Sequence, residues 1–499
     1  MTLEKERKII KPSKYSERIF SEVITTGNHI AVSAAPGSGK TTNLVEIAKL
    51  LPYGKKSIFV AFNRHIVKEL KERLPQTTTA STMHSLGAKA IGAHYQNGWF
   101  LSEGKQIKYL LPYFENKTNR EKWPIIYQLD RVMQLMRATM TPLTREGIEK
   151  LVEKQAIDID EEHYWTVIRA LRDIYAYNDQ DWNSKMEIDF TDMVEHCVRC
   201  KEIQMPQFDY VMVDEAADMS TLDRKFINKL VKPGRGRKIL VGDKNQSIYS
   251  FKGTDIDSFQ QFAGEERTIT LPLSISYRCA KAIVKEAQKV YKEGIEEWNE
   301  SPEGIVRIGK VEEIKEADFV LCRNTRPLVD VFFQLIEAGK KASIVGRDSE
   351  KGLLKLLSQF QSHEETINCF ERLKNALSQY YDLVKAKGIT NPLVNAKYII
   401  FQEKVEIIKL LFSKFTTIKE VEDFISEIFS DEEREGVKLS TIHKAKGLEC
   451  NTVFIIEKYK GVELIPSPYA ITEDQLKQEK NLKFVSISRA KLELVYLHL

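Results

Sequence analysis

No apolar run in this sequence of 499 residues approaches the roughly 20 residues that a membrane-spanning helix requires. The first residues, Met1–Lys8, are charged and lack the apolar core of a signal peptide. We therefore expect a cytoplasmic protein without a membrane partner. A chain of this length is expected to form two or more domains, each with an ample core.

Cysteine is also scarce. Six cysteines are scattered along the chain, which suggests reduced thiols in a reducing compartment. Cys197 and Cys200 form one C-x-x-C pair, which could be half of a zinc or iron–sulfur site, but the sequence has no second C-x-x-C to complete it. Cysteines that pack within a helix are the favoured interpretation.

Neither sign of charge is in large excess, because 75 basic and 71 acidic residues leave a net charge of +4. Overall charge therefore neither requires nor excludes a nucleic-acid partner, and a site for a polyanion must arise from local placement. Residues 232–238 form a local basic segment. A solvated turn before the next strand is its favoured interpretation, and a phosphate contact is the alternative.

The most informative segment that is present runs from Ala34 to Thr42. It follows the apolar run 29–32 and precedes a helical pattern over 43–50, so that a strand, a Gly-rich turn and a helix follow one another. Gly37 and Gly39 allow backbone N–H groups to turn inward around an anion, and the helix N-terminus adds partial positive charge. This order predicts a phosphate-binding loop.

Two side chains of this loop carry the chemistry. The Lys40 ammonium can reach the β- and γ-phosphates of a nucleotide, and the Thr41 hydroxyl can ligate Mg²⁺. Ala34 stands where the first glycine of such a loop is usual. The residues expected to contact the nucleotide are Ala35, Pro36, Gly37, Ser38, Gly39, Lys40, Thr41 and Thr42.

Short apolar strands alternate with helices in the first part of the chain, at 57–62, 208–215 and 238–243. This alternation predicts a parallel sheet with helices on both faces, whose ligands bind where the strands end. Asp214 and Glu215 end one of these strands. The Asp214 carboxylate is expected to hold Mg²⁺, and Glu215 to accept a proton from the attacking water.

A second strand–helix series begins near residue 269, and the regions 85–204 and 350–433 are helix-like and rich in charge. The prediction is an α/β fold with two parallel-sheet cores, each interrupted by a mainly helical insertion. The boundaries expected are 1–87 and 205–262 for the first core, 88–204 for its insertion, 263–349 and 434–499 for the second core, and 350–433 for a reduced second insertion.

Further motifs occur in a fixed order along the chain, at 62–64, 82–86, 188–193, 214–218, 241–253, 277–278, 441–449 and 485–491. With the phosphate loop, they resemble those of superfamily 1 DNA helicases of the UvrD/Rep/PcrA type. The string T-x-H-x-x-K-G-L-E at 441–449 is the most specific of them. The resemblance implies two RecA-like cores of the P-loop NTPase class, in a short form with a reduced second insertion.

The resemblance also implies an ATP site with Mg²⁺ as its metal, held by Thr41 and Asp214. Gln246 would sense the γ-phosphate, and Arg278 and Arg489 would project onto it, where fixed guanidinium groups stabilise transition-state charge. Tyr277 would stack on the adenine, and Glu449 would lie near the ribose. The predicted catalytic residues are Lys40, Asp214, Glu215, Gln246, Arg278 and Arg489.

For DNA, the resemblance places a base-stacking position at Phe251, with Tyr249 nearby. Phe62 is a second candidate for stacking, although a buried phenylalanine at a strand end is equally consistent with its pattern. The remaining predicted contacts are Asn63, Thr82, His84, Lys252, Thr441 and His443. For the two histidines the alternative is a hydrogen-bonded spacer.

The resulting hypothesis is an ATP-dependent DNA helicase that moves 3′ to 5′ on single-stranded DNA and acts at junctions of single- and double-stranded DNA. The alternative is an ATPase stimulated by single-stranded DNA, working as the motor or sensor subunit of a nuclease-containing recombination or phage-defence complex. Nuclease, replication or recombination proteins are therefore the partners considered. Ser16 occupies the position of the glutamine with which the family reads adenine.

Overall fold

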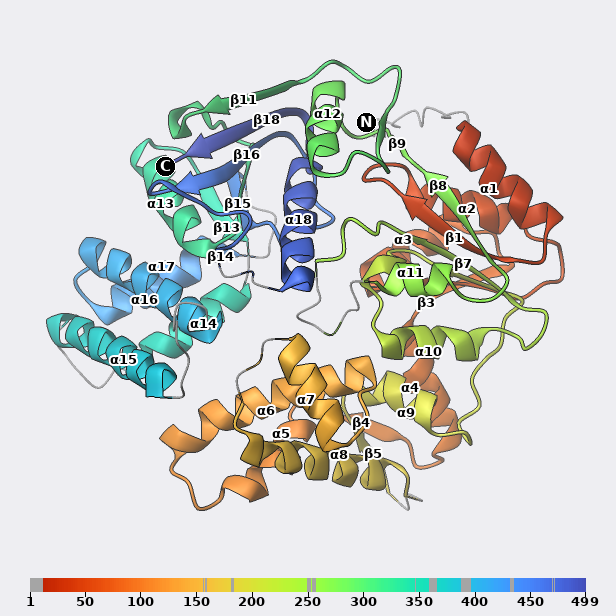
Figure 1. Ribbon diagram of the computed structural model, residues 1–499, viewed down its shortest axis with the longest axis horizontal. Helices are drawn as coiled ribbons and strands as arrows, with labels where there is room; N and C mark the ends of the chain where they lie inside the picture. The colour runs from red at the N-terminus through yellow and green to blue at the C-terminus, as the bar shows by residue number, and fades with distance from the viewer. Residues whose placement is uncertain are drawn as a thin grey trace, which may run out of the picture. The chain divides into compact units, whose positions relative to one another are not determined.

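The structure is a computed structural model that describes residues 12–155, 157, 159–180, 184–248, 253, 257–345, 347–358, 366–386, 396–430, 435–468, 470 and 472–499. The chain divides into two compact units, Met1–Ile275 and Ser276–Leu499. Each unit contains a sheet of parallel strands with helices packed on it (Figure 1). The predicted α/β fold class with two parallel-sheet cores is confirmed.

The first unit begins with helix α1 and alternates strands and helices around its insertion. Its strands are β1 (His29–Ala34), β2 (Ser57–Ala61), β3 (Thr78–Thr82), β4 (Trp99–Leu101), β5 (Met186–Ile188), β6 (Tyr210–Val213), β7 (Arg237–Gly242) and β8 (Thr268–Leu273). Its helices are α1 (Lys14–Thr25), α2 (Lys40–Leu50), α3 (Arg64–Arg73), α4 (Met83–His94), α5 (Lys105–Leu110), α6 (Asn119–Thr139), α7 (Arg145–Lys154), α8 (Tyr164–Asn178), α9 (Asp192–Arg199), α10 (Thr221–Leu230) and α11 (Ser258–Ala263).

Six of these strands form one sheet in the order β3-β2-β6-β7-β1-β8. All of its neighbouring pairs are parallel. The carboxyl ends of the strands therefore lie along a single edge of the sheet. At this edge lie the residues that follow β1, β2, β3, β6 and β7. They include the phosphate loop and most of the predicted contacts of the first unit.

The sheet is buried on both faces, and β1 shows why. Ile30 and Val32 point into a core formed with α1, α2 and α3, whereas Ala31 between them points into a core formed with α4, α9, α10 and α11. Successive side chains of a strand alternate between faces. The continuous apolar run 30–32 is what a strand covered on both sides requires.

The insertion of the first unit has a core of its own. Buried side chains of α5, α6, α7 and α8 pack on one another, among them Leu129, Met133 and Leu171. Helix α9 returns the chain to the sheet and packs with α4 and α10. Cys197 of α9 is buried there, with its Sγ 3.6 Å from the carbonyl oxygen of Gly87.

The second unit repeats the alternation with a shorter insertion. Its strands are β10 (Glu296–Glu297), β11 (Ile305–Gly309), β12 (Phe319–Cys322), β13 (Ala342–Val345), β14 (Phe429–Ser430), β15 (Val437–Thr441), β16 (Cys450–Tyr459), β17 (Val462–Glu463) and β18 (Ala490–His498), and β9 (Ile275–Ser276) lies at its boundary with the first unit. Its helices are α12 (Lys281–Val290), α13 (Thr325–Glu337), α14 (Arg347–Leu357), α15 (Thr366–Ala386), α16 (Ala396–Lys414), α17 (Ile418–Ile428) and α18 (Glu473–Ile487).

The main sheet of this unit follows the order β11-β18-β16-β12-β15-β13-β14, with the short β17 paired antiparallel to β16. Helices α14 to α17, which form the second insertion, share one continuous apolar core with α13 and one face of the sheet. The second insertion therefore has no separate core among the described residues, unlike the first. The four-part set of domain boundaries given above stays a prediction.

Local elements agree with the expectations from the sequence to within a few residues, but the basic segment 232–238 differs in one respect. Its last two residues belong to β7 and are buried. The Arg237 guanidinium donates to the carbonyl oxygens of Val23 and Asn28, at 2.5 and 2.8 Å. The segment is therefore partly a strand whose charges are used internally, and not a solvated turn throughout.

Among the described residues, no helix has both the length and the apolar character that crossing a membrane requires.

The packing of Gly87 of α4 against α9 predicts a strong effect of one methyl group. A Cβ atom at Gly87 of α4 would lie 1.7 Å from the carbonyl oxygen of Met193 of α9. We expect Gly87→Ala to lower the free energy of unfolding by about 3 kcal/mol, because the two helices must separate. Gly104→Ala is the control, since nothing lies within 4 Å of its Cβ. Equal stability of the two variants in thermal or chemical unfolding would contradict this packing.

Candidate functional site

The phosphate loop has the backbone that its glycines predict. Gly37 and Gly39 adopt φ angles of 68° and 78°, which side chains with a Cβ rarely adopt. Gly39 directly precedes the first turn of α2, so the N–H groups of that helix end open onto the loop. The Ser38 hydroxyl oxygen is buried and has no hydrogen-bond partner among the described residues. A loop with an unpaired buried hydroxyl and open N–H groups fits the phosphates of a nucleotide.

The two acids predicted to face this loop do so. The Lys40 ammonium lies 2.9 Å from Glu215 Oε1, and the Thr41 hydroxyl donates to Asp214 Oδ2. Asp214 and Glu215 follow β6 directly, and α2 begins at Lys40. A threonine hydroxyl beside a carboxylate is the ligand set that Mg²⁺ takes next to a phosphate chain. The residues present therefore fit a magnesium–nucleotide complex.

A third carboxylate joins them from the end of β7. Asp243 is buried, and it accepts hydrogen bonds from the Gln246 amide at 2.7 Å and from the Asn245 N–H at 2.9 Å. Gln246 is thereby oriented by a residue of the nucleotide site. Gly242 allows this strand end to approach the 216–218 turn, because a Cβ there would lie 2.7 Å from the backbone nitrogen of Ala217.

Burial and mutual charge control protonation here. Burial alone would lower the pKa of Lys40, but the surrounding carboxylates, that of Glu215 foremost, raise it. Burial and the neighbouring Glu215 charge raise the pKa of Asp214 above its ordinary value. Burial also raises the pKa of Asp243. The lysine therefore stays charged, while two of the acids ionise less readily than usual.

Two positions of the predicted nucleotide site, Ser16 and Thr42, have partners within the first unit. Ser16 is buried in the first turn of α1, where its N–H donates to the N-cap hydroxyl of Ser13 at 3.1 Å. The Thr42 hydroxyl accepts a hydrogen bond of 3.3 Å from Arg73, at the end of α3. An arginine side chain thus lies beside Thr42, although sequence reasoning did not name it.

Four predicted DNA contacts lie at the carboxyl edge of the first sheet. Phe62 and Asn63 follow β2, and Phe62 is exposed by 39%. The Asn63 side chain accepts from the Ile66 N–H at 2.8 Å and caps α3. Thr82 ends β3 and caps α4, and His84 is exposed in the first turn of that helix.

Sequence reasoning missed one exposed aromatic residue beside this group. Phe190 lies between β5 and α9, is exposed by 48%, and meets the His84 ring edge to face at 6.0 Å between ring centres. A single-stranded nucleic acid is held by such exposed rings together with backbone contacts. The available signal was a phenylalanine between Asp189 and Asp192 in a segment already noted as a motif.

Three predicted DNA contacts, Tyr249, Phe251 and Lys252, lie outside the described residues.

In the second unit, two predicted charged residues, Arg278 and Glu449, lie together with Lys491. Glu449 precedes β16 and forms ion pairs with Arg278 and with Lys491, the latter at 2.6 Å. Burial alone would raise the pKa of Glu449, but these two cations hold it below its ordinary value. Tyr277 meets Trp298 at 5.5 Å between ring centres. Arg278 and Glu449 are thus brought together, within their own unit.

Arg489, just before β18, is almost fully buried. Its guanidinium donates to the carbonyl oxygens of Val485 and Leu448, at 3.0 and 3.2 Å, and to the Ser488 hydroxyl at 3.1 Å. These bonds fix the direction of the side chain at the end of α18. Its predicted action on a phosphate stays a prediction.

Thr441 and His443 lie at the carboxyl end of β15. The Thr441 carbonyl oxygen accepts from the N–H groups of Lys444 and Ala445, both at 3.0 Å, which closes a tight turn. Thr441 in the second unit therefore ends its strand as Thr82 does in the first.

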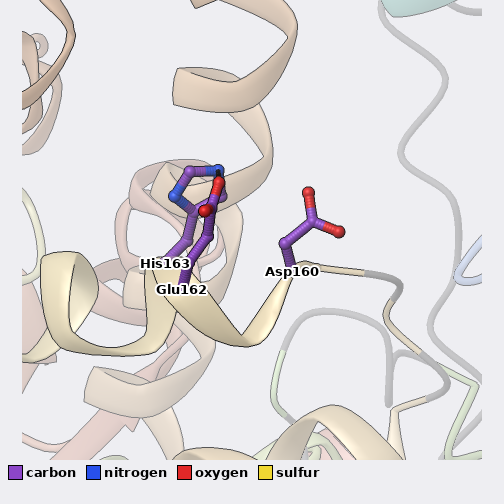
Figure 2. Close-up of side chains that lie close together, drawn as sticks. All are labelled: Asp160, Glu162 and His163. Carbon is purple, nitrogen blue, oxygen red and sulfur yellow. Dashed lines mark ion pairs between the residues drawn. The ribbon is translucent and has the colours of Figure 1, made fainter.

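One further cluster has the residue types of a metal site. Asp160, Glu162 and His163 place one ligand atom each within 4.8 Å of one another. Figure 2 shows Glu162 beside the His163 ring, with Asp160 to one side. Glu162 Oε1 lies 3.5 Å from His163 Nε2. Exposed acids next to one histidine are common on protein surfaces, and we assign no function to this group.

A glycine-rich loop between a strand and a helix, facing acids that follow another parallel strand of the same sheet, defines the class of P-loop nucleotide hydrolases. Residues 16–266, just over half of the chain, match the family described as the UvrD/REP helicase N-terminal domain. The chain belongs to this family. The resemblance inferred from the motifs is thus confirmed, and with it the RecA-like character of the two cores.

Several curated proteins are similar over most of this chain. F-box DNA helicase 1 of Gallus gallus is 23% identical over 97% of this chain and 48% of its own length. F-box DNA helicase protein 1 of Schizosaccharomyces pombe is 21% identical, over 95% and 56%. The chain thus spans about half the length of these two relatives. Putative ATP-dependent DNA helicase YjcD of Bacillus subtilis is 20% identical, over 95% of this chain and 77% of its own length.

The raised pKa of Asp214 predicts a gain in stability when its charge is removed. A raised folded-state pKa means that the related stability is full below the ordinary aspartate pKa of 3.8 and is lost as pH rises through the folded value. We therefore expect Asp214→Asn to unfold at a higher temperature than the unchanged protein at pH 8, without nucleotide or Mg²⁺. The gain should disappear toward pH 3.8.

The matched control is Asp223→Asn, because Asp223 is a buried carboxylate with a raised pKa that caps α10 through Ser220. Its loss removes hydrogen bonds of the cap as well as charge, so a smaller gain or a loss is expected. A pH-independent effect of Asp214→Asn in a calorimetric series would contradict the electrostatic explanation.

Proposed function

We infer that this protein is an ATP-dependent DNA helicase or translocase that moves 3′ to 5′ on single-stranded DNA and separates strands at duplex junctions. The observation that carries the proposal is the convergence of Lys40, Thr41 and Asp214 at the carboxyl edge of the first sheet. Exposed aromatic and polar side chains continue along the same edge. Family membership and relatives named DNA helicases support the nucleic-acid substrate. The polarity rests on the motif resemblance.

ATP and Mg²⁺ are the proposed cofactors, and they supply the phosphoryl group and the cation that neutralises its charge. Lys40 contacts the β- and γ-phosphates, and Thr41 and Asp214 hold the metal. Glu215 takes the proton of the attacking water. The Lys40–Glu215 ion pair opens as Lys40 turns to the phosphates, and this leaves Glu215 as an available base.

In this proposal the second unit contributes Arg278 and Arg489 to the γ-phosphate, Tyr277 to the adenine and Glu449 to the ribose. The fixed guanidinium of Arg489 supports such a role, because a preoriented cation stabilises transition-state charge without reorganisation. Gln246, held by Asp243, is the proposed link between the phosphate site and the DNA groove.

The proposed DNA groove uses strand ends of both units. Phe62 and Phe190 offer exposed rings for bases, and Asn63, Thr82, His84, Thr441 and His443 offer polar groups for phosphates. In this proposal, each cycle of ATP binding and hydrolysis moves the DNA contacts of one unit relative to those of the other, and this movement carries the protein along a strand. Tyr249, Phe251 and Lys252 remain part of the prediction.

A Lys40→Met variant tests the nucleotide site. Methionine keeps the length of the side chain but removes the charge that contacts the phosphates, so ATP turnover should fall by at least about 100-fold. Lys49→Met is the control, because Lys49 lies on the same helix and forms an ion pair with Glu46 on the surface. Circular dichroism should show both variants folded. Normal turnover in Lys40→Met would show that the site is misassigned.

A forked DNA substrate with the unchanged protein then tests the activity itself. Strand separation that requires ATP, and that occurs with a 3′ single-stranded tail but not with a 5′ tail, is the expected result. Turnover stimulated by single-stranded DNA without strand separation would overturn autonomous unwinding, and would favour the alternative of a motor subunit beside a nuclease.

Phe190→Ala tests the nucleic-acid edge. Loss of one stacked base should weaken binding of oligo-dT by about 1–3 kcal/mol and leave ATP turnover without DNA unchanged. Tyr53→Ala is the control, since Tyr53 is exposed by 96% in the turn before β2, at the opposite edge of the sheet. Equal affinities of the two variants in fluorescence anisotropy would exclude Phe190 from the interface.

A further inference from the structure

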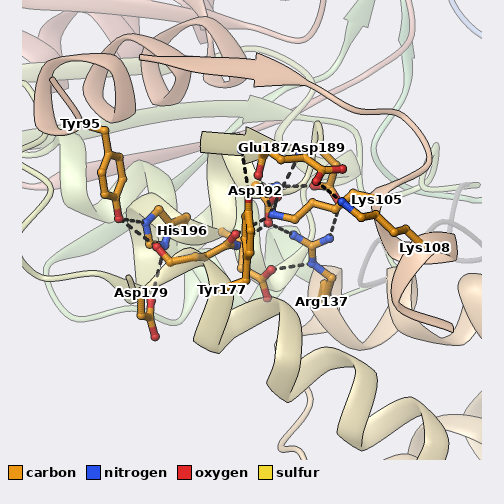
Figure 3. Close-up of polar contacts among 12 residues, drawn as sticks. Tyr95, Lys105, Lys108, Arg137, Tyr177, Asp179, Glu187, Asp189, Asp192 and His196 are labelled. Carbon is orange, nitrogen blue, oxygen red and sulfur yellow. Dashed lines mark hydrogen bonds and ion pairs between the residues drawn. The ribbon is translucent and has the colours of Figure 1, made fainter. Parts of the chain in front are cut away.

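The first insertion contains a buried cluster of charges centred on Arg137 of α6. The three guanidinium nitrogens each donate to a different carboxylate, those of Asp189, Asp192 and Glu195, and each distance is 2.6 Å. The Arg137 side chain is fully buried, and the three acids are exposed by 9% or less. Figure 3 shows the Arg137 side chain directed toward Asp189 and Asp192. Nothing in the proposed chemistry of the nucleotide site uses this cluster.

The three acids are close neighbours in sequence, and they belong to the turn and helix that carry Phe190. Asp189 directly follows β5, and Asp192 and Glu195 lie on α9. The Asp189 N–H donates to Asp192 Oδ2 at 2.9 Å, and the Asp192 N–H donates to Asp189 Oδ1 at 2.7 Å. This reciprocal pair closes a tight loop around Phe190, and Arg137 holds both of its carboxylates.

A second cation supports the same loop. The Lys105 ammonium of α5 donates to Asp192 Oδ2 at 2.7 Å, to Asn178 Oδ1 at 2.6 Å and to the carbonyl oxygen of Glu187 at 2.8 Å. Burial alone would raise the pKa of Asp192, but Arg137 and Lys105 hold it below its ordinary value, so this acid stays ionised. The Tyr175 hydroxyl donates to Glu195 at 2.5 Å.

The cluster therefore fixes a loop whose one exposed aromatic residue stands beside His84. A buried ion pair gains little net stability, because the loss of hydration offsets the attraction. What such a satisfied network does supply is one fixed geometry, since breaking any bond leaves a buried charge unpaired. Stacking on a base likewise requires that the Phe190 ring be held in one orientation.

We propose that Arg137 is a positioning residue for nucleic-acid binding, whose three ion pairs hold the loop 189–192 so that Phe190 faces a base of single-stranded DNA. This proposal rests on the proposed function. It assigns to the helical insertion an indirect part in DNA affinity, because Arg137 of α6 holds the loop that carries the Phe190 ring. Arg137 itself touches no DNA.

The test compares Arg137→Lys with Phe190→Ala and with the double variant. Lysine keeps one positive charge for folding, but a single ammonium cannot meet three carboxylates in a plane as a guanidinium does. Arg145→Lys is the matched control in the same insertion, because Arg145 pairs with Glu149 and Glu161 on the surface. Affinity for oligo-dT and ATP turnover without DNA are measured for all variants.

We expect Arg137→Lys to raise the Kd for oligo-dT about tenfold and to leave turnover without DNA unchanged. In the Phe190→Ala background the same substitution should change Kd by less than about twofold, since the ring that it positions is absent. A purely structural role would weaken binding equally in both backgrounds, and that result would overturn the proposal. Unchanged affinity of Arg137→Lys would overturn it as well.

Amide hydrogen exchange without DNA separates this proposal from the proposed function. The Asp189 and Asp192 amides should exchange about tenfold faster in Arg137→Lys and at the original rate in Arg145→Lys. Unchanged exchange in Arg137→Lys shows that Arg137 does not hold the loop and overturns the proposal. If the unchanged protein binds no DNA, the proposed function fails, and the positioning of Phe190 for DNA fails with it, whatever the exchange rates show.

Discussion

In the part of the chain that the structure describes, the ammonium of Lys40 is the cation that faces the carboxylates of Asp214, Glu215 and Asp243 at the strand ends. Three negative charges against one positive charge leave an excess that burial makes costly, which is why the pKa values of Asp214 and Asp243 are raised. A divalent cation would cancel this excess. The parallel sheet gathers these carboxylates because β1, β6 and β7 end at one edge, and the proposed Mg²⁺ would balance their negative charge.

The nucleotide site and the proposed DNA contacts of the first unit lie along the same edge of the sheet. Strands β2 and β3 continue the sheet beyond β6, and their ends present Phe62, Asn63 and Thr82. Asp243 accepts a hydrogen bond of 2.7 Å from the Gln246 amide and also interacts with the charge of Lys40, so one carboxylate faces both the phosphate-loop lysine and the proposed link to DNA.

Much of the fold and of the nucleotide site could be predicted from the sequence, because the residues that form each element lie close together along the chain. The phosphate loop is a strand, a turn and a helix within 29–50, and two acids after an apolar run mark the end of β6. The burial of Arg137 and Arg489 could not be predicted, because arginine on a helix or before a strand is ordinarily exposed. The partners of Arg137 lie 52 or more residues away, and no local pattern announces them. Phe190 was within a noted motif, but no local pattern indicates that its ring is exposed.

The two groups of buried charge in the first unit therefore serve different ends. At the phosphate loop, the carboxylates exceed the lysine, and a hydroxyl and helix N–H groups stand open, so the site gains from binding. Around Arg137, two cations, a tyrosine and backbone N–H groups meet three carboxylates, so little is left to gain from a ligand. A network with unpaired polar groups can gain hydrogen bonds from a ligand, whereas a fully hydrogen-bonded network fixes the conformation of the residues that form it. The unit uses the first for nucleotide and, in our proposal, the second to keep one aromatic ring in place for DNA.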